Sequence, residues 1–418
     1  MKGLLRRYEH PLFVSCLAGL YGCQWRRYQR SRARPGDCCS SFALLVAAFC
    51  LTLVFLYFWG EAQNDYNDFD WWCRSSKLRC TFCFCISVMR GLIIGLYLAV
   101  LFSLYLVPLG LYSPCIKEEG TLGPAPALIG HRGAPMLAPE NTLMSFEKAV
   151  EAGSEGLETD VTISFDGVPF LMHDRSLRRT TNIQEVFKNR TDTLAAMFTW
   201  AELESLNAGA WFLSHNPFGT VGSLGAEDHM RAGNQSICSL QAFLQLAAHT
   251  DKLVIFDLYR PPRGHPYRDT WIQRTLERCT GLGSGFGDVL WLPSDLRALV
   301  QEMDPELQQT SGSRLPLEEL RSNHIVKLNL HYSAMSPELV RYYAAVNIST
   351  NLYVISEPWL YSLAWCTGVQ SVTTNAPQLL STMSAPLFLM TPDEYNLMWI
   401  LTDVVSLMLV LTIFMFHW

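Results

Sequence analysis

The chain has 418 residues, of which 49% are hydrophobic and 17% carry a charge. Because soluble globular domains carry charge on about a quarter of their residues, this composition disfavours a disordered chain and a coiled coil. The net charge of −6 argues against a nucleic-acid partner, since a polyanion attracts basic surfaces. The low charge instead predicts apolar membrane segments within an otherwise ordinary protein.

Three apolar stretches are long enough to cross the hydrocarbon core of a bilayer, which is about 30 Å thick. Residues 41–59 and 91–113 contain no charged side chain, and residues 395–418 contain Asp403 as their single charge. We therefore predict a multi-pass membrane protein whose transmembrane helices occupy these three ranges.

The charges beside these helices give conflicting orientations. The basic residues 1–40 place the N-terminus in the cytoplasm, because basic flanks stay on that side of a membrane. Two helices from that start would leave the following domain in the cytoplasm. Basic residues of the connecting loop, residues 60–90, give the second helix the opposite direction; they are Arg74, Lys77, Arg79 and Arg90.

Cysteines are concentrated in the N-terminal part of the chain. Ten of the 13 lie at or before Cys115, in or beside the predicted membrane segments. The large domain that follows holds only Cys238, Cys279 and Cys366. Three cysteines do not form a disulfide scaffold, so we expect the hydrophobic core to stabilise this domain.

Residues 125–384 have about the length of one α/β barrel. Short apolar, β-branched runs recur along this region, and helical patterns lie between several of them, as at 142–152 and 239–249. Strands that alternate with helices indicate a parallel sheet, and about eight strands favour a closed TIM (β/α)8 barrel flanked by transmembrane helices. The predicted strands are 127–130, 156–163, 168–172, 253–258, 289–292, 325–330, 352–355 and 371–374.

Catalytic side chains of such a barrel lie at the C-terminal ends of its strands. Two imidazoles, three carboxylates and a guanidinium fall at such positions. They are His131, His173, Glu158, Asp160, Asp257 and Arg132. Each signal alone also fits a solvated strand face or a structural histidine, whereas the ordered combination indicates a site. Glu158 and Asp160 stand two residues apart on one strand and therefore share a face.

Phosphodiester cleavage is the chemistry that needs this set. Carboxylates hold a hard divalent cation such as Ca²⁺ or Mg²⁺ through oxygen, and the cation polarises phosphoryl oxygens. Arg132 can add bidentate contacts to a phosphate. One histidine would take a proton from the attacking hydroxyl, and the other would protonate the leaving oxygen. A neutral pH optimum follows, since the pKa of an imidazole side chain is about 6.5.

The region 125–384 resembles the glycerophosphodiester phosphodiesterase family, and the flanking apolar segments resemble its multi-span ectoenzyme branch. Five motifs carry the resemblance in order: His131-Arg132-Gly133, Pro139-Glu140-Asn141-Thr142, Glu158-Thr159-Asp160, Asp166-Gly167 and His173-Asp174. The resemblance implies a TIM barrel that hydrolyses a glycerophosphodiester with a bound metal. In that family's pattern, His131 and His173 match the acid/base pair, Glu158 and Asp160 match two metal ligands, and Arg132 matches a phosphate contact.

The chain departs from the family pattern at the third metal ligand. That ligand is usually a glutamate in an E-x-K motif, whereas Asp257 stands there in this chain and Tyr259 replaces the lysine. The shorter aspartate would bind the metal through water or more weakly. Lys327, near the end of a predicted strand, is a candidate for the missing positive charge, and a surface role fits it equally.

The motifs leave the substrate open. The family branch implies glycerophosphocholine, glycerophosphoinositol or the glycosylphosphatidylinositol anchors of membrane proteins, with attack by the substrate's own glycerol hydroxyl and a cyclic phosphate as intermediate. One alternative is a catalytically weak barrel that acts as a membrane signalling or interaction protein. Another is a phospholipase D-like enzyme that cleaves lysophospholipids or sphingomyelin. The long segment 178–233 above the barrel would select among substrates.

The resemblance also bears on location in the cell. Relatives of this branch carry about five spans before the barrel, which places the barrel outside, whereas this chain shows two. We expect that a block of three spans is absent near residues 72–74. Three glycosylation sequons favour an exoplasmic barrel on the plasma membrane or an endomembrane; they begin at Asn189, Asn234 and Asn347.

Overall fold

The computed structural model describes Leu51 and residues 95–417, except 107–108, 110–112, 281–288, 306 and 335. The predicted N-terminal segment 1–40, the connecting loop 60–90 and, apart from Leu51, the first predicted span lie outside the described residues. The chain divides into two compact units, Lys117–Leu389 and the segments on either side of it.

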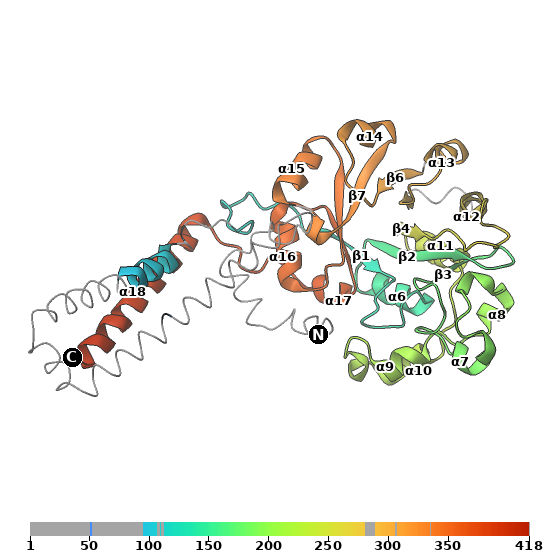
Figure 1. Cartoon of the computed structure of the whole chain (residues 1–418), viewed down its shortest axis with the longest axis horizontal. Helices are drawn as coiled ribbons and strands as arrows, with labels where there is room; N and C mark the ends of the chain where they lie inside the picture. The colour runs from blue at the N-terminus through green and yellow to red at the C-terminus, as the bar shows by residue number, and fades with distance from the viewer. Residues whose placement is uncertain are drawn as a thin grey trace, which may run out of the picture. The chain divides into compact units, whose positions relative to one another are not determined.

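Eight parallel strands close into a barrel within Lys117–Leu389, so the predicted TIM barrel is confirmed (Figure 1). Neighbouring strands follow chain order, and β1 closes the ring by pairing with both β2 and β9. The barrel strands are β1 (Ala127–His131), β2 (Gly156–Ile163), β4 (Leu253–Leu258), β5 (Val289–Trp291), β6 (Gln308–Ser311), β7 (Ile325–His331), β8 (Ser349–Tyr353) and β9 (Ser371–Thr374).

Two strand predictions were wrong. Residues 168–172 do not form a barrel strand: β3 (Pro169–Leu171) pairs antiparallel with the end of β2. The predicted list also omits β6, because this strand is polar although Gln309, Thr310 and Ser311 are buried. Arg297 Nη1 donates to the side-chain oxygen Oε1 of Gln309 at 2.7 Å, which satisfies one buried polar group of β6.

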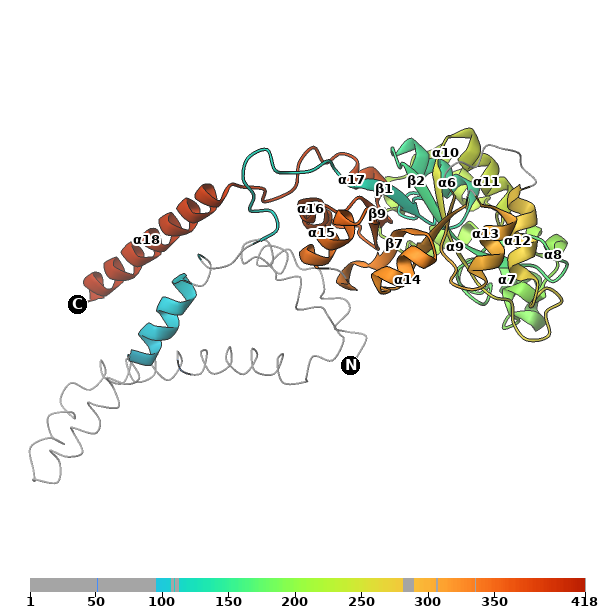
Figure 2. The ribbon, with the colours of Figure 1, turned by 90° about the horizontal axis from the view of Figure 1, so that it is seen from above.

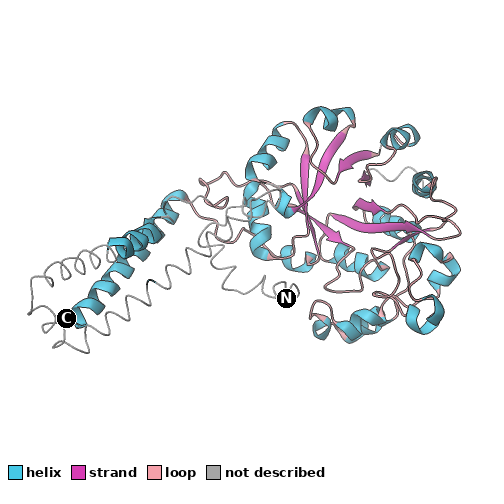
Figure 3. Ribbon diagram, viewed as in Figure 1, coloured by secondary structure: helices cyan, strands magenta, loops and turns pink. Residues whose placement is uncertain are grey.

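Helices surround the strands of the barrel (Figure 3). The two predicted helices are confirmed to within one residue at each end, as α6 (Leu143–Glu151) and α11 (Leu240–His249). Thr142 and Ser239 cap them, because each hydroxyl accepts from a backbone N–H of the first turn. The remaining barrel helices are α12 (Trp271–Thr280), α13 (Arg297–Met303), α14 (Leu317–Ser322), α15 (Pro337–Ala345), α16 (Pro358–Thr367) and α17 (Pro377–Leu380).

Alternation along the strands separates the core from the site. Leu157 and Val161 of β2 pack outward with helical side chains such as Phe243. Glu158 and Asp160 alternate with them and therefore point into the barrel, where Ile129 and Ile255 belong to a separate buried cluster. His131 and Asp257 follow those isoleucines by two residues. Polar groups thus lie directly above an apolar layer.

The segment between β3 and β4, predicted as a long loop over 178–233, consists of short helices. They pack around buried side chains such as Phe198 and Phe212. This segment, which we call the covering segment, is therefore structured, and it shares its buried clusters with side chains outside it such as Phe170 of β3 and Met144 of α6. Its helices are α7 (Ile183–Val186), η4 (Lys188–Arg190), η5 (Ala195–Met197), α8 (Trp200–Glu204), α9 (Ala210–His215), η6 (Val221–Ser223) and α10 (Ala226–Gly233).

The third predicted span corresponds to α18 (Pro392–His417), the long C-terminal helix in Figure 2. Among the described residues, Pro392–Ile413 is the single helical stretch long and apolar enough to cross a membrane. The described part of the second predicted span contains a shorter apolar helix, Gly95–Leu106. Outside these helices, Cys115 and Cys366 are disulfide-bonded, whereas Cys238 is free and buried.

Gly133→Ala is expected to destabilise the barrel by about 2–5 kcal/mol. Gly133 has a φ of 88°, and an added Cβ would lie 2.4 Å from the carbonyl carbon of Ser145. Thermal melting of the purified full chain in detergent should show a Tm lower by about 5–15 °C. Gly153→Ala is the matched control, because φ is 85° there and no atom lies within 4 Å of the added Cβ. Equal losses from both substitutions would contradict the packing argument.

Candidate active site

His131 ends β1 and is held from two sides. Its Nδ1 lies 2.6 Å from Asn375 Oδ1, just after β9, and its Nε2 lies 3.9 Å from Glu158 Oε2. Because an amide oxygen only accepts, Nδ1 carries the proton and the Nε2 lone pair stays available. Burial, and then the charge of Arg132, lower the pKa of His131 to about 4. The imidazole is therefore neutral at neutral pH.

His173 reaches the same edge by a different route. β3 runs back along β2, so that the backbone N–H of Met172 donates to the Asp160 carbonyl at 2.9 Å. His173 follows at once, with Nδ1 at 2.8 Å from Asp174 Oδ1. A carboxylate that accepts from Nδ1 directs Nε2 away from Asp174. Thus the antiparallel return places an imidazole beside Asp160 of β2.

Three carboxylates come from two neighbouring strands. Asp160 of β2 stands opposite Asp257 of β4, and Glu158 precedes Asp160 by two residues on the same face. Burial, followed by the charge of Asp160, raises the pKa of Glu158 well above its usual range. The same two causes raise the pKa of Asp257. Such buried, mutually repelling carboxylates are stabilised by a cation.

Asp160 is the most heavily paired of the three. Its carboxylate accepts from Asn141 Nδ2 at 3.1 Å and from the Tyr259 hydroxyl at 3.2 Å. Arg132 Nε lies 3.1 Å from Asp160 Oδ2 as an ion pair, and Arg132 Nη1 donates to Glu140 at 3.0 Å. Tyr259, which replaces the family's lysine, therefore supports a predicted metal ligand through its hydroxyl.

The oxygen donors fit a hard cation by their chemistry, because buried Glu158 and Asp160 stand on the strand beside partly buried Asp257. Two of these three carboxylates have raised pKa values. In the part of the chain that the structure describes, no three His, Cys, Asp or Glu side chains are already gathered at metal-binding positions. Asp160 is held by Arg132, Asn141 and Tyr259 instead. Cation binding would have to rearrange these contacts.

Lys327 does not join this group. It is the third residue of β7 and pairs with Ser349, the first residue of β8. His331, four residues later, ends the strand at the edge where the other groups lie. At about 3.3 Å per residue, Lys327 stands about 13 Å before that edge. The expectation that it lies near the catalytic end of a strand was wrong.

Several site residues were not predicted. Asn375, Tyr353 and His331 lie at or just after the C-terminal ends of β9, β8 and β7, so the strand-end rule could have found them. Burial, followed by the charges of Asp257 and Glu158, raises the pKa of Tyr353, which places this phenol near both carboxylates. These residues extend the polar edge around the ring of strands.

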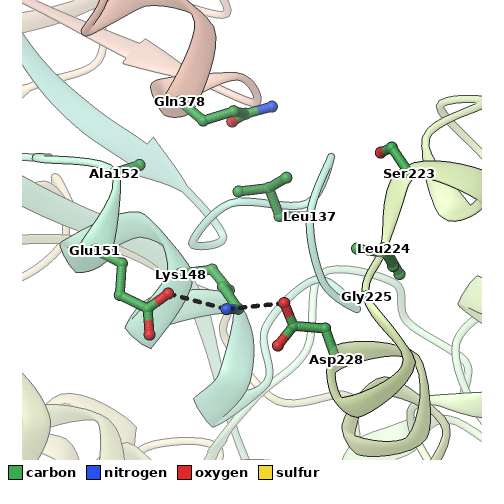
Figure 4. A pocket seen from close by; sticks show the side chains of 9 residues that line it. All are labelled: Leu137, Lys148, Glu151, Ala152, Ser223, Leu224, Gly225, Asp228 and Gln378. Atoms are coloured by element: carbon green, nitrogen blue, oxygen red, sulfur yellow. Dashed lines mark hydrogen bonds and ion pairs between the residues drawn. The ribbon is translucent and has the colours of Figure 1, made fainter.

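A pocket of about 300 Å³ lies outside this edge (Figure 4). Lys148 of α6 points into it, and its Nζ lies 2.9 Å from Glu151 and 3.0 Å from Asp228. Two carboxylates thus neutralise the cation, which leaves no positive charge for a phosphate. The other residues that line the pocket are Leu137, Ala152, Ser223, Leu224, Gly225 and Gln378.

Comparison with known proteins identifies the class that this barrel and its polar edge define. Residues 131–261 match the model of the glycerophosphoryl diester phosphodiesterase family. The chain is 39% identical to glycerophosphodiester phosphodiesterase domain-containing protein 5 of Gallus gallus, over 99% of this chain and 86% of that protein. It is 40% identical to the protein of that name in Homo sapiens, over 98% and 84% of the two chains. The chain therefore belongs to the glycerophosphoryl diester phosphodiesterase family, whose members are phosphodiesterases.

Two further comparisons concern function and fold. The chain is 46% identical to a glycerophosphoinositol inositolphosphodiesterase of Mus musculus, over 78% of this chain and 60% of that protein. A phosphodiesterase of Oleispira antarctica, solved in complex with the product sn-glycerol-3-phosphate, is similar in fold, with a TM-score of 0.51 and 23% identity over 62% of this chain and 96% of that one.

The alignment with the Gallus gallus protein extends over 513 residues, which exceeds this chain by 95, so at least 95 aligned positions have no residue here.

Proposed function

We propose that the chain hydrolyses glycerophosphodiesters at this edge of the barrel, with His131 as general base and His173 as general acid. The carrying observation is that a separate acceptor holds each imidazole by Nδ1, Asn375 for His131 and Asp174 for His173. The amide oxygen of Asn375 accepts from Nδ1 and so leaves the lone pair of His131 on Nε2, which suits a base. A carboxylate beside His173 suits an imidazolium that donates its proton.

The proposed steps use the chain's own groups. His131 Nε2 takes the proton of the attacking hydroxyl as the oxygen of that hydroxyl bonds to phosphorus. Attack by water gives the phosphomonoester directly. Attack by the substrate's glycerol hydroxyl gives a cyclic phosphate, and water then opens one of its two ring P–O bonds to give the phosphomonoester. The bond from phosphorus to the leaving oxygen breaks as His173 supplies a proton to that oxygen. Arg132 offers its guanidinium to the phosphate. When bound by Glu158, Asp160 and Asp257, Ca²⁺ or Mg²⁺ would polarise the phosphoryl oxygens and offset their charge.

The test is hydrolysis of glycerophosphocholine and glycerophosphoinositol by the purified full chain. We expect a phosphomonoester product from at least one of them, with no product from lysophosphatidylcholine or sphingomyelin. Preference for those lipids would instead favour the phospholipase D-like alternative. An inert chain that keeps a cellular phenotype after His131→Ala would favour the interaction protein.

Removal of divalent cations is expected to abolish hydrolysis, and added Ca²⁺ or Mg²⁺ should restore it. Asp257→Asn removes one charged oxygen ligand and should raise the cation concentration needed for half-maximal activity about 10-fold or more. Asp257→Glu should lower that concentration, since it restores the side-chain length usual at this position. Activity that is unchanged by chelation would exclude the proposed metal site.

We also propose that α18 and the apolar segment around Gly95–Leu106 span a membrane, with the barrel on the exoplasmic side. Large apolar side chains of these helices are exposed, for example Phe102 at 67% and Leu401 at 55%. Disulfide-bonded Cys115 and Cys366 favour an oxidising compartment. The three sequon asparagines are exposed and could accept glycans; they are Asn189, Asn234 and Asn347. The aligned positions without a residue here are enough in number for the block of spans that we propose is absent near residues 72–74.

Glycosidase treatment of the chain expressed in cells tests the exoplasmic side. A mobility shift that is lost when the three sequon asparagines are replaced by glutamine is the expected result. An unshifted band, with the barrel protected from an impermeant protease in intact cells, would place the barrel inside or in a retained form. Proteins with glycosylphosphatidylinositol anchors become candidate substrates only on an exoplasmic barrel.

A further inference from the structure

We propose that Arg179 is a positioning residue: it holds Asp174 against His173 and ties this pair to Glu140 in the loop after β1. The inference rests on the proposed role of His173 as a proton donor. Arg179 lies at the start of the covering segment, residues 178–233, and follows His173 by six residues.

The guanidinium of Arg179 makes two hydrogen bonds to each of two carboxylates. Its Nε and Nη2 donate to Asp174 at 2.7 and 3.1 Å. Its Nη1 and Nη2 donate to Glu140 at 2.7 and 2.6 Å. Only a planar guanidinium can serve both carboxylates in this way, because a lysine ammonium is a point charge on a flexible stem.

Both carboxylates continue the contacts into the site. Asp174 Oδ1, which accepts from Arg179, also lies 2.8 Å from His173 Nδ1. Glu140 Oε1, which accepts from Arg179, also accepts from Arg132 Nη1 at 3.0 Å. Arg179 is therefore the link between the proposed proton donor and the proposed phosphate contact.

The charges of this network stabilise one another. Hydrogen bonds from His173 and Arg179 lower the pKa of Asp174 against the effect of its burial. Burial disfavours the ionised form of Glu140, but the hydrogen bonds and charges of Arg179 and Arg132 outweigh it and lower this pKa as well. The hydrogen bond to Glu140 is the main cause that raises the pKa of Arg179. Asp174, Glu140 and Arg179 are thus ionised at neutral pH.

The covering segment adds a packing contact to Arg179. The guanidinium carbon lies 5.6 Å from the ring centroid of Trp211 on α9, within the range of a cation–π contact. Trp211 is itself almost fully buried. The covering segment therefore restrains the arginine that orients Asp174, although it contributes neither proposed proton-transfer group.

The consequence concerns the tautomer and orientation of His173. A carboxylate held in place by Arg179 accepts from the Nδ1–H of His173, which favours the imidazolium and directs its Nε2–H toward the leaving oxygen. Without the arginine, Asp174 and Glu140 lose their shared counter-charge and Asp174 can turn away. The chemical step should then slow, because about 1 Å of misplacement can cost about 10²-fold.

A double-mutant cycle on the purified full chain tests this link. Arg179→Gln should lower kcat about 10- to 100-fold. In a His173→Ala background the same substitution should lower kcat less than 2-fold, because the positioned group is already gone. Equal losses in both backgrounds would overturn the proposal, since they would indicate a merely structural role. Arg179→Lys should retain less than a tenth of the wild-type kcat, and full rescue by lysine would also overturn it.

Two controls separate this inference from the proposed function. Arg178→Gln is the matched control, because Arg178 pairs with the exposed Asp192 and the variant should keep wild-type kcat. At a pH where the His173 ring is neutral, its ¹⁵N chemical shifts should show a proton on Nδ1 in the wild type and a tautomer mixture in Arg179→Gln. An unchanged tautomer would overturn the positioning role alone. Wild-type kcat in His173→Ala would overturn the proposed acid, and the inference with it.

Discussion

His131→Ala is expected to lower kcat for a glycerophosphodiester by about 10²- to 10⁴-fold, the usual contribution of a positioned acid or base. Asn375 holds Nδ1 of His131, and the lowered pKa keeps Nε2 free to accept a proton at neutral pH. Alanine supplies no acceptor at this position. The measurement is the initial rate of phosphomonoester formation at saturating substrate.

The control for this substitution is His229→Ala. His229 is an exposed histidine of α10, and its replacement should leave kcat within 2-fold of the wild type. Melting temperatures of both variants should stay close to that of the wild type, which separates lost chemistry from lost folding. A folded His131→Ala variant with more than half of the wild-type kcat would contradict the assignment of the base.

Glu158→Gln is expected to lower activity at least about 10²-fold while leaving the cation-free protein as stable as the wild type or more stable. Burial and the charge of Asp160 raise the pKa of Glu158, so ionisation of this group opposes folding when no cation is bound. Its contribution to stability is present at acidic pH and is lost as the pH rises through the raised pKa. A neutral glutamine removes that cost but supplies a weaker ligand.

Thermal melting with and without Ca²⁺ or Mg²⁺ measures both halves of this prediction. Cation should raise the Tm of the wild type, because a ligand that binds only the folded state stabilises it. The same cation should raise the Tm of Glu158→Gln little or not at all. A cation-dependent rise of equal size in both proteins would show that Glu158 is not a ligand. Glu155→Gln on the same segment is the control, because Glu155 is exposed.

Most of the barrel could be predicted because its strands are buried apolar runs that alternate with amphipathic helices. β3 was misassigned because Val168–Met172 has the same apolar character as a barrel strand. The correct signal was nearby: Asp166-Gly167 lies between two strand patterns, and an Asp-Gly pair there indicates a tight hairpin. Gly167 indeed has a φ of 87°. A hairpin requires antiparallel strands, which excludes β3 from the parallel ring.

β6 escaped prediction for the opposite reason. Its residues Gln308–Ser311 are polar, and tertiary contacts such as the hydrogen bond from Arg297 to Gln309 Oε1 allow the last three of them to be buried. Sequence patterns report burial through apolar side chains, so a strand whose buried groups are satisfied by hydrogen bonds leaves no such signal.

The site was predictable to the extent that it follows strand ends. His131, Glu158, Asp160 and Asp257 lie where β1, β2 and β4 place them. Arg179 had no comparable signal, because it lies in an irregular segment and reaches the site only through its contacts with Asp174 and Glu140. The expectation that Lys327 lies near the site was wrong because an apolar run in the sequence does not show where β7 begins and ends.

The most direct test of the central claim is ³¹P NMR of the purified full chain with glycerophosphocholine or glycerophosphoinositol and a divalent cation. The account predicts that the phosphodiester signal is replaced by that of a phosphomonoester in the wild type. It also predicts that the signal persists unchanged in the doubly substituted chain His131→Ala, His173→Ala. Conversion by the double variant at the wild-type rate would contradict the assignment of the active site, and a folded, cation-loaded wild type that converts neither diester would contradict the proposed reaction.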